Sequence, residues 1–195
     1  MIWIALTILI IVLVMQLIVA KARLKKVGFL VLAASALAIF GWAGYQAFQQ
    51  YHLWKNNEVS QFLLPPYQSW DYFVFYARTR FFNPYLLSLL IGLVFLWAAK
   101  MLNKKYQERF FEPIEPYLLA MSIFLVGHPL WLFYLIILLF LFLIINFALS
   151  TFHFWLNKEM PRISLYYFWL PAAIFTIIII SRWISSLLWW NLLKL

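Results

Sequence analysis

The chain contains no cysteine, and only 11% of its 195 residues are charged. The lack of cysteine excludes a disulfide framework, thiolate catalysis, and zinc or iron–sulfur sites with cysteine ligands. A soluble domain carries about 25% charged residues, so this chain has too few charges to cover a water-facing surface. With 67% hydrophobic residues, it instead has several apolar runs long enough to cross a bilayer. The composition therefore predicts an all-α, polytopic integral membrane protein.

Acidic residues are scarce as well, with six Asp and Glu against fifteen Lys and Arg. The resulting net charge of +9 can indicate nucleic-acid binding. Here the basic residues lie in short segments beside apolar runs, which is the pattern that orients a membrane protein. We therefore expect no nucleic-acid partner. The expected partners are the lipid bilayer and other membrane subunits, or further copies of this chain.

Apolar runs predict six transmembrane helices in a single membrane domain that covers the whole chain. The first run has no basic residue ahead of it and exceeds the apolar core of a signal peptide, so we interpret it as a span. The fourth is short because Gly127-His128-Pro129 should break a long apolar stretch; without that break, five spans result. The predicted spans are about 1–20, 27–48, 84–99, 116–127, 130–150 and 168–190.

The basic residues predict the orientation of these spans. Under the six-span interpretation, ten of the fifteen Lys and Arg lie in loops on one side, four lie on the other, and Arg182 lies inside the last span. Because basic loops stay in the cytoplasm, the amino terminus is expected outside. The expected location is a bacterial inner membrane. Arg182 marks a partner or a cavity, or it reaches outward to the membrane surface.

Residues 60–83 are rich in aromatic side chains but too charged for a span. Trp70, Phe73 and Ala77 share one helical face, and Asp71, the only aspartate of the chain, lies beside them. Aromatic residues together with arginine favour the headgroup region of a bilayer. We expect an interfacial helix on the outer surface; a lid over a substrate is the alternative.

The second span carries small residues at helical spacing, namely Ala34, Ala38, Gly41 and Gly44. Small residues let a neighbouring helix approach closely in a membrane. Packing inside this protein is the simpler interpretation of that face. A docking face for another subunit is the alternative.

Few residues could carry chemistry. His52 and His128 could both lie near the outer side and could in principle ligate a haem, whereas His153 falls on the cytoplasmic side. Isolated histidines near helix ends are more often hydrogen-bonded structural residues, so we expect no cofactor and no metal site.

Glu112 and Glu115 directly precede the short fourth helix, which is expected to begin at Pro116. Acidic residues at a helix amino terminus are stabilised by the helix dipole. Lys21 and Arg23 are expected on the same side of the membrane. We expect these cations to keep Glu115 ionised, which would prevent it from sharing a proton with a second carboxyl group.

The layout resembles that of prepilin peptidases, the six-span aspartyl proteases that process type IV pilin leaders. Glu115 stands where that family has its second catalytic aspartate, at the opening of a short helix. Gly127-His128-Pro129 stands where the family has a Gly-Trp-Pro-like break, and residues 161–171 match the start of the last span. The resemblance covers roughly residues 84–180.

The catalytic motifs of that family are missing. Its first aspartate would fall near Ala20 and Lys21, where there is no carboxyl group, and its Gly-x-Gly-Asp motif is replaced around Glu115. The resemblance therefore implies a catalytically degenerate relative, and we expect a non-enzymatic membrane protein that packs against partners or assists assembly. One alternative is a transporter subunit that binds a vitamin-type small molecule. Another is a membrane enzyme that uses Glu115 with Glu112 and His153.

Overall fold

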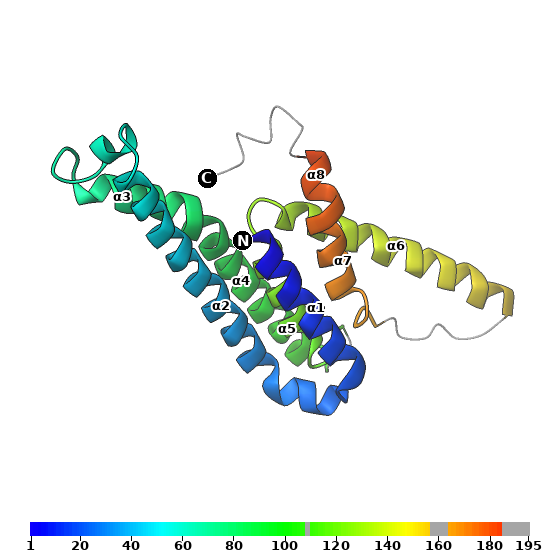
Figure 1. Ribbon diagram of the computed structural model, residues 1–195. Coiled ribbons are helices and arrows are strands. Elements are labelled where there is room, and N and C mark those ends of the chain that lie inside the picture. Colours follow the sequence, from blue (N-terminus) through cyan, green and yellow to red (C-terminus); the bar gives the residue numbers. More distant parts are fainter. Residues whose placement is uncertain (108–109, 157–163, 185–195) are drawn as a thin grey trace.

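The computed structural model describes residues 1–107, 110–156 and 164–184, and all regular structure in these ranges is helical (Figure 1). Three helices are long and apolar enough to cross a membrane, and three shorter apolar helices accompany them. The predicted helical, membrane-associated chain is confirmed to this extent. The three long helices are Lys26–Lys55, Trp70–Lys105 and Trp131–Phe152; the shorter ones are Ile2–Ile18, Glu115–Val126 and Trp169–Ile180.

The described residues form α-helices and a few shorter turns of other helix types. A 3₁₀ turn, η1, follows the second helix, and two π-helical turns, η2 and η3, lie inside longer helices. In chain order the elements are α1 Ile2–Ile18, α2 Lys21–Lys55, η1 Ser60–Leu63, α3 Trp70–Ala77, η2 Arg78–Phe82, α4 Asn83–Lys105, α5 Glu115–Val126, α6 Trp131–Leu156, α7 Trp169–Phe175, η3 Thr176–Ile180 and α8 Ser181–Ile184.

The short helix α5 lies at the centre of the fold, in contact with α1, α2, α4, α6 and α7 (Figure 1). Every α5 residue except Tyr117 is buried. A helix that is apolar on all sides is stable only when other elements surround it. Its length of ~18 Å is well below the ~30 Å apolar core of a bilayer. Because other helices surround α5, it is a core helix of the fold despite this short length.

The closest contact in the core joins α4 and α5. The buried face of α4 presents small residues to α5 at Ser88, Gly92 and Ala99. A Cβ atom added to Gly92 would lie 2.7 Å from the backbone oxygen of Ala120. Glycine at this position therefore sets how closely the two helices approach.

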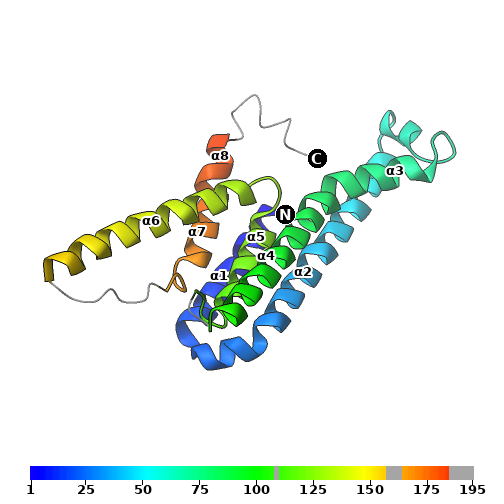
Figure 2. The same cartoon turned by 180° about the vertical axis from the view of Figure 1, so that it is seen from behind.

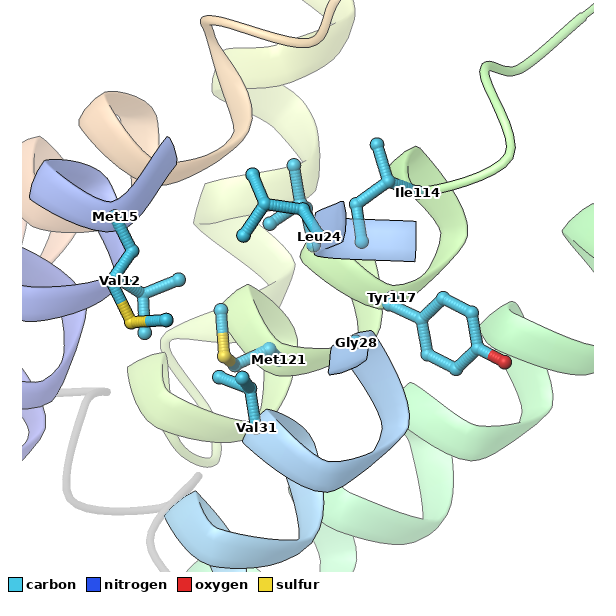
Figure 3. Close-up of a pocket in the computed structure, with 9 residues that line it drawn as sticks. Val12, Met15, Leu24, Gly28, Val31, Ile114, Tyr117 and Met121 are labelled. Carbon is cyan, nitrogen blue, oxygen red and sulfur yellow. The ribbon is translucent and has the colours of Figure 1, made fainter. Parts of the chain in front are cut away.

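A second close contact joins α2 to α5. Around it, Val12, Met15, Val31 and Met121 border a cavity of only about 20 Å³ (Figure 3). A Cβ atom added to Gly28 would lie 2.9 Å from the Cδ1 atom of Ile114. The obstacle is thus the flexible end of a side chain, so this glycine is less constrained than Gly92.

The helical structure is interrupted between α5 and α6, as the sequence predicts. The helix α5 ends at Val126, and Gly127 has a φ of +79°, which glycine adopts without a Cβ clash. Pro129 then lacks the amide proton needed to continue the helical hydrogen bonds. Beyond the break, α6 points away from the rest of the fold in both views (Figures 1 and 2).

Residues 70–82 do not form a separate interfacial helix. They continue through α3 and the π-helical turn η2 into α4, giving one helix of 36 residues from Trp70 to Lys105. Pro84 lacks an amide proton, and a π turn immediately before it accommodates that change in the hydrogen-bond pattern. The expected boundary between an interfacial helix within residues 60–83 and a span that begins at Pro84 was therefore wrong.

The aromatic face that the sequence predicts is present, but it packs against α2. Phe73 and Ala77 are buried together with Trp54 and Leu64, and the ring of Trp54 lies 5.5 Å from that of Phe73. This cluster joins the end of α2 to α3, and Figure 1 shows these two segments next to each other. The aromatic residues thus connect two helices of the protein, a role that an isolated interfacial helix would not have.

The small-residue face of α2 does not pack within the described part of the chain. Ala34, Ala38, Gly41 and Gly44 are all exposed, and a Cβ atom added to either glycine would meet nothing within 4 Å. Packing inside the protein, the simpler interpretation of this face, is therefore wrong for the described residues.

Candidate functional site

Three segments that are far apart in the sequence meet at one end of the helices, close to the start of α5. Lys21 opens α2, Glu112 and Glu115 lead into α5, and Ser164 precedes α7. The Lys21 ammonium lies 2.9 Å from the Oε1 atom of Glu112 and 4.4 Å from the ring centre of Tyr166. The loops that the charge pattern assigns to one side of the membrane are thus in direct contact.

The centre of this cluster is the hydroxyl group of Ser164. Its Oγ atom lies 2.8 Å from Oε1 of Glu112 and 3.0 Å from Oε1 of Glu115. The other carboxyl oxygen of Glu115 accepts a hydrogen bond of 2.8 Å from the Glu112 backbone N–H. Ser164 therefore bridges two carboxyl groups, one of which, Glu115, is only 1% exposed.

This geometry favours a proton shared between the two carboxyl groups. A serine hydroxyl has one proton to donate, so it can donate to only one of two ionised carboxylates. When Glu115 is neutral, its own O–H donates to Ser164, Ser164 donates to Glu112, and every contact is satisfied. The Lys21 ammonium then balances the charge that remains on Glu112.

The electrostatics of Glu115, which precedes the apolar segment of α5, point the same way. Burial raises the pKa of Glu115 above its ordinary value of 4.5. Contacts with the Glu112 backbone amide and the Ser164 hydroxyl lower that pKa, and the negative charge of Glu112 raises it. The indole N–H of Trp169 also lowers it, although this N–H makes no hydrogen bond of good geometry.

The expectation that Lys21 and Arg23 keep Glu115 ionised stays a prediction, although the Lys21 ammonium pairs with Glu112. Lys21 contacts Glu112, and Glu115 lies behind that pair with its pKa raised by burial. Glu112 and Glu115 are only three residues apart, so the sequence could not show which of them would form the ion pair with Lys21.

An apolar cavity of about 450 Å³ lies beside Glu115, between α4, α5, α6 and the start of α7. The cavity is lined almost entirely by apolar side chains, and Glu115, which also borders it, is only 1% exposed. Leu139 and Phe142 of α6 line it and are also exposed at the surface. The cavity therefore opens toward the apolar exterior of the fold.

The other residues singled out from the sequence lie elsewhere. His128 accepts a hydrogen bond of 3.2 Å from the indole N–H of Trp131, and the ring of His52 packs 4.4 Å from that of Phe48. Asp71 lies exposed in the first turn of α3. Arg182 is exposed on α8. Within the described ranges, no three His, Asp or Glu side chains gather as a metal site would require.

Two contributors were missed in the sequence. Ser164 belongs to no motif, and only the fold brings it to the carboxyl groups. Asn103 holds the segment before α5, because its side chain donates to the Phe111 carbonyl at 2.7 Å and accepts from the Phe111 N–H at 2.9 Å. A buried asparagine at the end of an apolar helix was the available signal for this second contact.

No family model matches this chain, and neither the characterised proteins nor the solved structures compared with it give a match.

Proposed function

We propose that this chain is a non-enzymatic integral membrane subunit that packs against other membrane chains through the exposed small-residue face of α2. We further propose that it crosses an inner membrane six times with its amino terminus outside. The three shorter apolar helices would cross it while packed against the three longer ones. Its layout supports descent from a prepilin-peptidase-like ancestor that lost the catalytic aspartates.

The observation that supports partner packing is how the glycines are used. The chain has five glycines. Gly28 and Gly92 lie where a Cβ atom would meet a neighbouring element at less than 3 Å, and Gly127 has a positive φ. Neither a close neighbour nor a positive φ explains Gly41 and Gly44, since a Cβ atom added to either would meet nothing within 4 Å. Glycine in a helix costs about 0.5–1 kcal/mol relative to alanine, so a close-packed partner explains their presence.

Single-cysteine crosslinking tests this proposal directly, because the natural chain has no cysteine. A bifunctional maleimide applied to native membranes is expected to give discrete higher-mass adducts from Ala38→Cys and Gly41→Cys. The matched control is Val94→Cys on α4, which is 62% exposed but lies on no small-residue face. Adding Gly44→Leu should remove the α2 adducts, because a large side chain prevents close approach of another helix.

Equal adduct patterns from Ala38→Cys and Val94→Cys would overturn the proposal. The orientation is tested with two further single-cysteine variants, because a membrane-impermeant maleimide should reach Gln68→Cys from outside and Lys104→Cys only after lysis. Labelling of Lys104→Cys in intact cells would contradict the proposed orientation.

A membrane enzyme is the second candidate function, and the Ser164 bridge favours it. Two carboxyl groups that share one proton provide an acid and a base in one site, and Glu115 borders a cavity able to hold an apolar substrate. The two functions predict different results for Glu115→Gln. In a subunit, the α2 crosslinks persist in this variant; in an enzyme that cleaves a hydrophobic leader peptide, the variant abolishes cleavage while the protein remains folded.

A further inference from the structure

One exposed face of α4 changes from apolar to basic along the helix. Exposed residues at spacings of three and four line this face: Leu90, Leu93, Trp97, Lys100 and Lys104. Trp97, which is 64% exposed, lies between the leucines and the lysines, and tryptophan is enriched where the apolar core of a bilayer meets the headgroups. The face therefore presents hydrocarbon, aromatic ring and positive charge in the order in which a phospholipid presents acyl chain, ester region and phosphate.

At the basic end of this face, Lys100 lies beside Tyr117 of α5. The Lys100 ammonium donates to the Tyr117 hydroxyl at 2.7 Å and lies 4.2 Å from the ring centre. The ring in turn lies next to Gly28 of α2, where an added Cβ atom would be 3.2 Å from its Cγ atom (Figure 3). Because the hydroxyl accepts from Lys100, its own proton points elsewhere, and no acceptor for it lies within the described ranges. Ammonium and hydroxyl together therefore offer several donors to one acceptor group.

The charges around this pair select an anion. The ion pair found in the described part of the chain involves neither Lys100 nor Lys104. Two further exposed cations, Arg23 and Lys26, lie in the first two turns of α2, the helix that meets Tyr117 at Gly28. An anionic phospholipid brings a net negative charge to these cations. A zwitterionic phospholipid also brings an ammonium group, which the same cations repel.

We propose that this face of α4 binds one anionic phospholipid, with its phosphate at Lys100 and Tyr117 and an acyl chain along Leu93 and Leu90. Lys104, one turn beyond Lys100, attracts the same headgroup. The site prefers phosphatidylglycerol to phosphatidylethanolamine and phosphatidylcholine. It requires the membrane crossing proposed above, but it does not require a partner on α2.

The test is lipid retention by the purified full chain in nanodiscs made of equal parts phosphatidylglycerol, phosphatidylethanolamine and phosphatidylcholine. Native mass spectrometry should show phosphatidylglycerol bound about thirtyfold over phosphatidylcholine, the ratio that two lysines near an anionic headgroup supply. The double variant Lys100→Gln/Lys104→Gln should lose this preference. Tyr117→Phe keeps the ring beside Gly28 and removes the hydroxyl, so it should lower the preference about fivefold.

The matched control is Lys55→Gln, which removes an exposed lysine at the opposite end of α2. Both leaflets of the nanodisc hold the anionic lipid, so this variant should keep the wild-type preference if the site is at Lys100. Lys100→Arg keeps the positive charge and should keep most of the preference. Equal retention of the three lipids by the wild type, or an equal loss in Lys55→Gln and in the double variant, would overturn the proposal.

Two further outcomes separate this site from its alternatives. Excess inorganic phosphate at constant ionic strength should leave the bound phosphatidylglycerol in place; displacement by phosphate would show an anion site that needs no lipid and would overturn the proposal. A chain that does not insert into nanodiscs would overturn the membrane crossing and the lipid site together. Loss of the α2 crosslinks, with the lipid preference intact, would overturn only the partner packing.

Discussion

Replacing Gly92 with alanine is expected to lower the free energy of unfolding by about 1–3 kcal/mol, the usual effect of overpacking a close contact. The added Cβ atom would lie 2.7 Å from the Ala120 backbone oxygen. Because the obstacle is backbone in the middle of α5, it can move away only if α4 and α5 separate. That separation disturbs the helix on which Glu115 lies.

The matched control for this substitution is Gly41→Ala on α2. A Cβ atom there meets nothing within 4 Å, so the change should leave stability the same or raise it by up to about 1 kcal/mol through helix propensity. Denaturation of both variants with SDS in mixed micelles measures the difference. Equal stability of Gly92→Ala and Gly41→Ala would contradict the close α4–α5 contact.

The second large effect is the pH dependence that Glu115 imposes on stability. Burial raises the pKa of Glu115 in the folded protein above the ordinary 4.5. Between these two pKa values, the folded protein holds a proton that the unfolded chain has lost. The contribution of Glu115 to stability is therefore fully present below about pH 4.5 and is lost as the pH rises through the folded pKa. The slope reaches at most about 1.4 kcal/mol per pH unit.

The variant Glu115→Gln should remove this slope. An amide keeps a donor for Ser164 and an acceptor for the Glu112 N–H, and it does not titrate. SDS unfolding from pH 4 to pH 8 should therefore show falling stability for the wild type and a flatter profile for Glu115→Gln. Glu58→Gln, an exposed glutamate near η1, should follow the wild type. A Glu115→Gln profile as steep as that of the wild type would show that Glu115 is not the group that titrates.

The sequence predicted features that depend on local covalent chemistry. Gly127 and Pro129 break the helix because one adopts a positive φ and the other lacks an amide proton, and neither effect depends on distant residues. The helical membrane-type composition is similarly local. The same reasoning failed at Pro84. A proline ends a helix only when the preceding turn cannot change its hydrogen-bond pattern to allow for the missing amide proton. Here the preceding residues form the π turn η2, and the helix continues.

The candidate site was only partly predictable, for a different physical reason. Glu112 and Glu115 stood out because carboxyl groups are rare in this chain and these two lead into a helix. Their protonation, however, depends on which of them Lys21 reaches and on the hydroxyl of Ser164, which lies 49 residues away from Glu115. Such contacts arise from tertiary packing and leave no periodic pattern in the sequence.

The unbroken helix from Trp70 to Lys105 joins the two ends of the molecule mechanically. At one end it carries the aromatic residues that pack against α2. At the other end, Asn103 forms two hydrogen bonds with the backbone of Phe111, just before the two glutamates. A stiff rod of ~54 Å transmits displacement along its length. A displacement of the aromatic end would therefore shift Phe111, which lies next to the two glutamates at the other end of the same helix.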